Sequence, residues 1–237
     1  MRSLFKKAPS LTGPIRSFYN YYFGEKEIKF LFRYLKKYKK KYIFIDIGAN
    51  YGIYTFLFAK KSEFTFAIEP IVECVNYLNK GYRKKNIEII NKVASNNKKN
   101  KTLNIPVENN KEIYGKSSID KNFAISKQIN SESFRVDELL DRIQKFKSEL
   151  LFIKIDVEGH ENLVIEGSLD LFNNKKTLLL IEIEKRHNKE FFNLFNSLKN
   201  LGFLTYCVRN RSLYRIEDIS NLEEIMKTNI NFLFKNY

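Results

Sequence analysis

The sequence predicts an α/β protein built on a doubly wound, mostly parallel sheet. The main observation is that short apolar runs alternate with amphipathic helical patterns from Tyr42 onward. Strands that are apolar along their whole length are typical of a parallel sheet with helices on both faces. Two further observations concern the first two strands: a glycine-containing turn follows "YIFIDI", and an acid, Glu69, follows "FTFAI". In such sheets ligands bind at the carboxyl ends of the strands, where both features lie.

The elements are expected in the following order. Strands are predicted at 42–47, 64–70, 87–95, 150–159, 177–184, 203–210, 212–217 and 230–236, where apolar and β-branched residues dominate. Helices are predicted at 53–61, 72–85, 161–172 and 189–202 from apolar residues at helical spacing. No internal repeat and no second domain interrupts this alternation.

Two segments depart from the pattern. Residues 1–40 are expected to form an N-terminal arm and an amphipathic helix: 1–24 carry Pro, Gly and aromatic anchors without a clean period, whereas 25–40 have a helical period and a basic face. The remaining residues, 41–237, form the main domain. Within it, 97–133 are polar with one strand-like piece, "TLNIPV", and such insertions often build the substrate side of a site.

The chain carries a net charge of +15, from 42 Lys and Arg against 27 Asp and Glu. One interpretation is an anionic partner, such as a nucleic acid, a lipid headgroup or a phosphorylated substrate. The other is a general Lys-rich composition, which the scattered distribution of the lysines favours. No apolar run approaches the roughly 20 residues of a membrane span, and the N-terminus lacks the apolar core of a secretory signal. Two distant cysteines, Cys74 and Cys207, predict buried thiols, so we expect a cytoplasmic protein.

The turn after the first strand indicates the ligand. Its pattern from Asp46 is D-x-G-x-x-x-G, which is neither the dinucleotide G-x-G-x-x-G nor a P-loop. An acid here would repel phosphate but suits a cationic group, such as the amino group of S-adenosylmethionine. Gly48 lets the backbone approach a ligand, Asn50 offers a polar side chain, and Glu69 could accept both ribose hydroxyls. The predicted cofactor residues are Asp46, Gly48, Asn50, Gly52, Tyr54, Glu69 and Pro70.

These residues belong to a longer series of motifs that resembles one family. "DIGANYGIYTF", "AIEP", "NKVASNN", "GKSSI", "FRVDELL", "LLFIKIDVEGHENLVIEGS" and "LLLIEIE" occur in order between about Tyr42 and Glu184. The series resembles the FkbM-type branch of the S-adenosylmethionine-dependent class I methyltransferases, of which D-V-E-G-x-E is characteristic. The resemblance implies a Rossmann-like, seven-stranded sheet with an antiparallel last strand. It also implies O-methylation, commonly of sugars in polysaccharides, of nucleotide-activated sugars or of natural products.

Acceptor chemistry is expected after the fourth strand. Methyl transfer to a hydroxyl needs an aligned oxygen and a group that removes its proton. The candidate catalytic residues are Asp156, Glu158 and His160. In a metal-assisted variant, Asp156 and Glu182 would hold Mg²⁺ or Mn²⁺; in a metal-free one, His160 or Asp156 is the base. His160 could instead be a solvated residue at a helix start, and Glu182 a helix cap or ion-pair partner.

Three further residues are assigned from local patterns. Ser117 and Ser118 in "GKSSID" could contact the acceptor or the cofactor, or could form a turn with local hydrogen bonds. His187 stands in a polar turn and is expected at the surface.

The function predicted from the sequence is O-methylation of a sugar hydroxyl, on a nucleotide-activated sugar or a surface polysaccharide of capsule or lipopolysaccharide type. RNA and small natural products are the alternative acceptors. DNA is not expected, and RNA is disfavoured because the chain has no recognised nucleic-acid module and no N/D-P-P-Y/F string. A third hypothesis is a non-enzymatic scaffold. It would require that the cofactor-binding residues have been lost, but Asp46, Gly48, Gly52 and Glu69 are all present. The aromatic arm also offers a surface through which two copies could associate.

Overall fold

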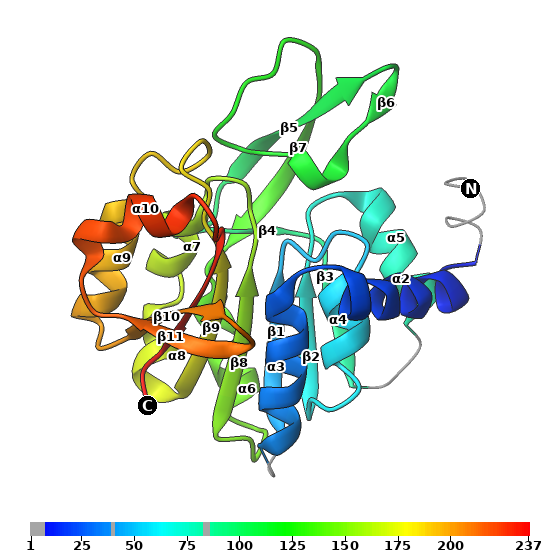
Figure 1. Cartoon of the computed structure of the whole chain (residues 1–237). Helices are drawn as coiled ribbons and strands as arrows, with labels where there is room; N and C mark the ends of the chain where they lie inside the picture. The colour runs from blue at the N-terminus through cyan, green and yellow to red at the C-terminus, as the bar shows by residue number, and fades with distance from the viewer. Residues whose placement is uncertain (1–7, 39–40, 83–85) are drawn as a thin grey trace.

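A mixed α/β sheet forms the centre of the molecule (Figure 1). The computed structural model describes residues 8–38, 41–82 and 86–237. The sheet order is β11-β10-β12-β9-β8-β1-β2-β3. Its parallel part consists of β3 (Ile87–Ile90), β2 (Phe64–Ile68), β1 (Tyr42–Ile47), β8 (Leu150–Ile155) and β9 (Lys176–Glu182). The predicted doubly wound α/β sheet is confirmed.

The other end of the sheet is antiparallel. The last strand, β12 (Asn231–Lys235), lies between β9 and β10 (Leu204–Arg209) and runs antiparallel to both, as expected. The described sheet has eight strands rather than seven because β11 (Ser212–Ile216) forms a hairpin with β10. Asn210 and Arg211 join the two with φ angles of 48° and 64°. Turns with positive φ at both positions match the strand twist, so this short hairpin adds the eighth strand.

Helices cover the sheet on both faces. On one face lie α3 (Lys26–Lys37), α4 (Ile53–Phe58) and α5 (Val72–Gly81); on the other lie α6 (Leu140–Ile143), α7 (Glu161–Glu166), α8 (Leu169–Asn174), α9 (Phe191–Asn200) and α10 (Leu222–Met226). The described residues also form the short 3₁₀ segments η1 (Tyr114–Lys116), η2 (Val136–Leu139) and η3 (Ile219–Asn221). In β1, Ile43 and Ile45 pack toward the second group while Phe44 packs toward the first. This period-2 alternation fixes which side chains reach each face.

The insertion is a small sheet of its own. β4 (Val93–Ala94), β7 (Ser126–Phe134), β5 (Asn100–Glu108) and β6 (Lys111–Glu112) pair in that order, and they lie beyond the carboxyl ends of the parallel strands (Figure 1). One strand-like piece was expected here. The sequence carries no strand signal for β7 because most of its side chains are polar, although only four of its nine residues are exposed. The run 87–95, expected as one strand, divides at Asn91–Lys92 between the two sheets.

The N-terminal segment differs from its prediction. The prediction of an irregular arm is wrong for residues 9–23. They form a helix, α2 (Pro9–Phe23), which packs against α4 and α5. Pro9 lies at the helix start, where its missing N–H costs nothing. Gly13 faces Phe56 so closely that a Cβ there would lie 2.3 Å from the ring. Packing therefore outweighs the unfavourable propensities of Gly and Pro. The basic-faced helix is confirmed as α3; residues 39–40 and 83–85 of the predicted helices lie outside the described residues.

None of the helices in these described ranges has the length and apolarity needed to cross a lipid bilayer. Cys74 and Cys207 are both buried thiols, as predicted, and no disulfide joins them.

The turn after β1 generates a stability prediction. Gly48 and Gly202 both have positive φ, 76° and 82°, but a Cβ at Gly48 would lie 1.9 Å from the carbonyl oxygen of Asp156, whereas one at Gly202 meets nothing within 4 Å. We expect Gly202→Ala to lower the free energy of unfolding by about 1 kcal/mol and Gly48→Ala by about 3 kcal/mol or more. Urea denaturation measures both. Equal losses would contradict the close approach at Gly48.

Candidate functional site

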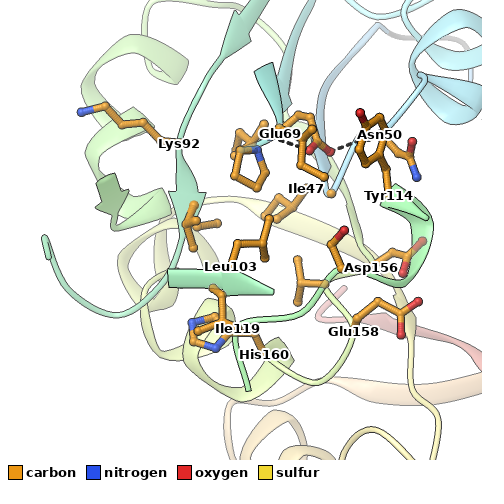
Figure 2. Close-up of a pocket in the computed structure, with 18 of the residues that line it drawn as sticks. Ile47, Asn50, Glu69, Lys92, Leu103, Tyr114, Ile119, Asp156, Glu158 and His160 are labelled. Atoms are coloured by element: carbon orange, nitrogen blue, oxygen red, sulfur yellow. Dashed lines mark hydrogen bonds between the residues drawn. The ribbon is translucent and has the colours of Figure 1, made fainter. Parts of the chain in front are cut away.

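A cleft lies where the parallel strands end beneath the insertion (Figure 2). It holds about 600 Å³ of space including its open mouth. The β1 turn, the end of β2, the segment after β8 and the insertion all contribute to its walls. Its polar lining residues are Asn50, Glu69, Lys92, Tyr114, Ser117, Asp156, Glu158 and His160.

Glu69 is fixed at the end of β2 by backbone groups. Its Oε2 accepts a hydrogen bond from the Asn50 N–H at 2.7 Å, and its Oε1 accepts one from the Ile71 N–H at 2.9 Å (Figure 2). Burial, only partly offset by these two donors, raises the pKa of Glu69 to about 7. Each oxygen keeps a second lone pair for a ligand donor. The carboxyl group is thus held rigidly in the wall of the cleft.

Asp46 is the penultimate residue of β1, and its two carboxyl oxygens differ in their hydrogen bonding. Its Oδ2 accepts from the Thr55 hydroxyl at 2.5 Å. Its Oδ1 is buried and has no hydrogen-bond partner among the residues described. Burial raises the pKa of Asp46, with Lys154 and Thr55 acting in the opposite direction. A buried acceptor without a donor is costly, so this oxygen fits a cationic or N–H group supplied by a ligand.

The two glycines of the turn have separate roles. Gly48 lines the cleft, but the 1.9 Å approach of the Asp156 carbonyl to its Cβ position shows that the β8 segment already requires a glycine there. The sequence reasoning assigned this requirement to the ligand alone. Gly52 starts α4 with φ 75°, and a Cβ there would lie 2.5 Å from Leu78. Asn50, with φ 48°, lines the cleft beside them.

The remaining two predicted cofactor residues lie in different places. Pro70 lines the cleft next to Glu69. Tyr54 does not line it: its ring is buried and its hydroxyl donates to Glu25 Oε2 at 2.5 Å. Tyr54 therefore lies on the α3–α4 face of the sheet, away from the cleft wall.

A second, smaller pocket, with about 170 Å³ of space including its open mouth, adjoins the cleft, and Asp156 and Glu158 line both. Asp156 Oδ2 accepts from Lys154 Nζ at 2.6 Å, and the same ammonium lies 5.0 Å from the centre of the Tyr54 ring. Burial opposes the charge of Lys154, but the carboxylates of Asp156 and Asp46 outweigh it and raise its pKa. The other lining residues of this acidic pocket are Glu158, Glu161, Glu182, Glu184 and His187.

Glu182 ends β9 in this acidic pocket. Burial, together with the neighbouring Asp156 carboxylate, raises the pKa of Glu182 to about 8, while Lys154 acts in the opposite direction. A carboxyl group that titrates near neutral pH can exchange a proton with a bound hydroxyl. A perturbed carboxyl in a pocket is a recognised feature of functional sites.

Glu158 joins the insertion to the β9 loop. Its Oε2 contacts Lys121 Nζ at 3.1 Å and His187 Nδ1 at 2.5 Å. His187 is therefore partly buried against Glu158, so the prediction that it lies at the surface is wrong. The sequence could not reveal this pairing because 29 positions separate the two residues. Burial lowers the pKa of His187, and the Lys121 charge lowers it further.

His160 precedes α7 and is buried, so its expected alternative as a solvated residue is wrong. Its Nδ1 lies 2.7 Å from Asp120 Oδ2 and its Nε2 lies 3.1 Å from the Ser95 hydroxyl. Both ring nitrogens are thus occupied by protein groups. His160 ties the insertion to the end of β4 while its ring lines the cleft.

The two serines of "GKSSID" separate in the structure. Ser118 donates to the Glu158 carbonyl at 2.8 Å and forms an isolated β-bridge with Asn104. Ser117 lines the cleft, and its buried hydroxyl has no partner within the described part of the chain. Sequence reasoning missed Lys92, Leu103, Tyr114 and Lys154. The alternation of Leu103 and Ile105 in "TLNIPV" was the one signal that could have placed Leu103 on an inward face.

The metal site predicted at Asp156 and Glu182 has no compact ligand set. Over residues 8–38, 41–82 and 86–237, no group of three or more His, Cys, Asp or Glu side chains is arranged to hold a metal ion.

The sequence matches the profile of one known protein family. A family profile, the methyltransferase FkbM domain, matches residues 46–226. The order of the main sheet, with antiparallel β12 between β9 and β10, agrees with the Rossmann-like class I methyltransferase fold that this family match implies. Because the match extends over most of the sequence, the chain belongs to the FkbM methyltransferase family. A search of curated proteins found no significant match.

Several solved structures resemble the chain at low identity. The FkbM methyltransferase of Methylobacillus flagellatus is 14% identical with a TM-score of 0.47, covering 98% of this chain but 57% of its own length. A Streptococcus mutans protein solved in complex with SAH is 11% identical, with a TM-score of 0.46 and coverages of 88% and 96%. An rRNA methylase of Streptococcus thermophilus is 12% identical, with a TM-score of 0.40 and coverages of 82% and 85%. This chain thus spans little more than half of the Methylobacillus protein.

The raised pKa of Glu69 predicts a pH-dependent stability. Because its pKa is about 7 in the folded protein and near 4.5 in the unfolded chain, the folded state binds a proton more tightly over that interval. The contribution of Glu69 to the free energy of unfolding is therefore complete below pH 4.5 and is lost as the pH rises to 7. We expect the unfolding free energy of the native protein to fall by about 3 kcal/mol relative to that of Glu69→Gln between these pH values. Urea denaturation at several pH values measures both unfolding free energies. If they change with pH in parallel, the raised pKa of Glu69 is contradicted.

Proposed function

We propose that the protein binds S-adenosylmethionine in the cleft and methylates a hydroxyl group of a sugar, in a nucleotide-activated sugar or a surface polysaccharide. The observation that carries this proposal is the position of Asp156, which lines both the cleft and the acidic pocket, as Glu158 also does, and is held by the buried Lys154 ammonium. A carboxylate held in place by Lys154 therefore stands between a compartment suited to the cofactor and a compartment suited to a polyhydroxyl acceptor.

The residues of the cleft fit this cofactor. Glu69, in the cleft wall, presents two fixed oxygens for hydroxyl groups. Asp46 is not among the residues that line the cleft, but its buried Oδ1 lacks a donor within the described part of the chain. Ser117 adds a hydroxyl without a partner among the described residues, and Ile71 and Leu103 supply apolar wall. Bound there, S-adenosylmethionine supplies an electrophilic methyl group on a sulfonium. Asp46 would hold its amino group and Glu69 its ribose.

The acidic pocket fits a hydroxyl acceptor. Carboxylates accept hydrogen bonds from hydroxyls and so orient them. Asp156 Oδ2 already accepts a hydrogen bond from Lys154 Nζ at 2.6 Å, which fixes the position of this carboxyl group. Glu182, with a pKa of about 8, is better matched to removing the acceptor proton near neutral pH. We assign orientation of the acceptor to Asp156 and proton removal to Glu182.

Glu158 and His160 take positioning roles in this proposal. Glu158 is held by contacts to Lys121 and His187, and both nitrogens of His160 are occupied by Asp120 and Ser95. Neither group is therefore available to take a proton without first breaking a buried contact. Both instead connect the insertion to the strand ends and so shape the wall between the two pockets.

A divalent ion does not fit the Asp156–Glu182 pair. Lys154 Nζ is already 2.6 Å from Asp156 Oδ2, so a metal at this carboxylate would displace a buried ammonium. The ammonium provides positive charge beside the acceptor oxygen, and no step in this proposal uses a metal.

Methyl transfer tests the proposal. With S-adenosylmethionine and a panel of nucleotide sugars, we expect a methylated product by mass spectrometry, and titration calorimetry should detect binding of the cofactor and of its demethylated product. Asp156→Asn and Glu182→Gln should keep cofactor affinity within about threefold and lower kcat by roughly 100-fold or more. Prior dialysis against EDTA should leave kcat unchanged.

Three results would contradict parts of the proposal. No calorimetric binding of either cofactor form removes the cofactor assignment. Full activity in Asp156→Asn removes the acceptor assignment, and activity on RNA but on none of the sugars replaces the acceptor class. Lys185→Ala is the control and should leave methyl transfer unchanged. Lys185 follows the pocket residue Glu184 in the sequence, but it is exposed and pairs with Glu223 outside the pocket.

A further inference from the structure

Helix α2 is amphipathic in the opposite sense to the other helices. An ordinary surface helix turns its apolar face toward the core. In α2 the buried residues are Pro9, Gly13 and Ser17. Its large apolar side chains face solvent instead, and Phe23 is 76% exposed. The outward residues, called here the aromatic stripe, are Leu11, Ile15, Phe18, Tyr19, Tyr22 and Phe23.

The aromatic stripe is continuous along one side of the helix. Its residues recur at spacings of three and four, which places them in one band about 140° wide at 100° per residue. Neighbouring rings contact one another: Phe18 and Tyr22 have centroids 4.6 Å apart, and Tyr19 and Phe23 5.1 Å apart. No charged side chain belongs to the band, because Arg16 turns away to lie over the Tyr51 ring at 5.2 Å. Exposed apolar bands of this size usually mark an interaction surface.

Basic residues follow the aromatic stripe directly. In α3, which begins three residues after α2 ends, Lys26, Arg33, Lys36 and Lys37 are exposed. Lys29 lies against α2 itself, donating to the Tyr22 carbonyl at 2.6 Å. Both helices run along the same side of the molecule (Figure 1). An apolar band flanked by cations, on a chain of net charge +15, is complementary to an anionic and apolar surface.

We propose that α2 is an interfacial helix that attaches the protein to an anionic lipid membrane. It lies parallel to the surface with the aromatic stripe in the headgroup region, while the cations of α3 contact the lipid phosphates. Tyr and Phe suit this depth because their rings are apolar and the Tyr hydroxyl stays hydrated. This attachment is independent of the methyl-transfer site.

Two other occupants fit the surface less well. A second copy of the chain would bring two bodies of charge +15 together, which their repulsion opposes. A single-stranded RNA would need cations that track its backbone between the stacked bases. The aromatic stripe has no such cation and includes the aliphatic Leu11 and Ile15, which offer no ring for stacking.

Vesicle binding tests the proposal. We expect the full chain to co-sediment with vesicles of phosphatidylglycerol and phosphatidylcholine, and to bind pure phosphatidylcholine vesicles at least about tenfold more weakly. Phe18→Ser/Phe23→Ser should weaken binding to the anionic vesicles by about tenfold or more. Arg33→Glu/Lys37→Glu should abolish the preference for the anionic lipid. Tyr214→Ser removes an exposed ring on β11 and should change nothing.

Circular dichroism is the control for folding of each variant. Because the substituted side chains are exposed, we expect every variant to keep the fold. Absence of binding to anionic vesicles at low salt overturns the proposal. So does equal weakening in Tyr214→Ser. If Phe18→Ser/Phe23→Ser instead dissociates a dimer in analytical ultracentrifugation, or abolishes binding to an RNA oligonucleotide while vesicle binding persists, the surface belongs to that partner.

Discussion

The buried ammonium of Lys154 is the interaction on which the candidate site depends. It donates to Asp156 at 2.6 Å and also lies within electrostatic reach of Asp46 and Glu182. Without it, three carboxyl groups at the ends of adjacent strands would repel one another in a region of low polarity. With it, Asp156 has a buried ion-pair partner and the rise in the pKa of Glu182, to about 8, is partly opposed. The charge of one lysine thus divides two similar carboxyl groups into different chemical roles.

Sheet register brings these groups together. Asp46 pairs with Lys154 across β1 and β8, and Ile155 pairs with Ile181 across β8 and β9, so Asp156 and Glu182 follow at the same level. All four side chains point to the face that carries α3 and α4. Because side chains alternate along a strand, a slip of one residue would send this polar layer into the opposite apolar core. The hydrophobic residues that fix the register therefore also fix the chemistry.

The sequence predicted the parallel sheet, its helices and the strand-end location of the site because apolar period and turn chemistry are local signals. It placed Asp46, Asn50, Glu69, Pro70 and Asp156 at one end of the sheet, where the structure also has them. It failed where tertiary contacts decide: α2 forms through packing against Phe56, His160 is buried between Asp120 and Ser95, and His187 pairs with Glu158. Lys154 could not be recognised as a site residue because a lysine in an apolar strand carries no signal of its partners.

The pH dependence of methyl transfer in Lys154→Met tests this account most directly. In the native protein, kcat should rise with pH and reach half its maximum near the Glu182 pKa of about 8. Removing the ammonium should shift that midpoint upward by roughly one pH unit or more, because the positive charge that favours the ionised carboxyl is lost. An unchanged midpoint in a folded Lys154→Met variant would contradict the claim that this lysine sets the protonation of the site.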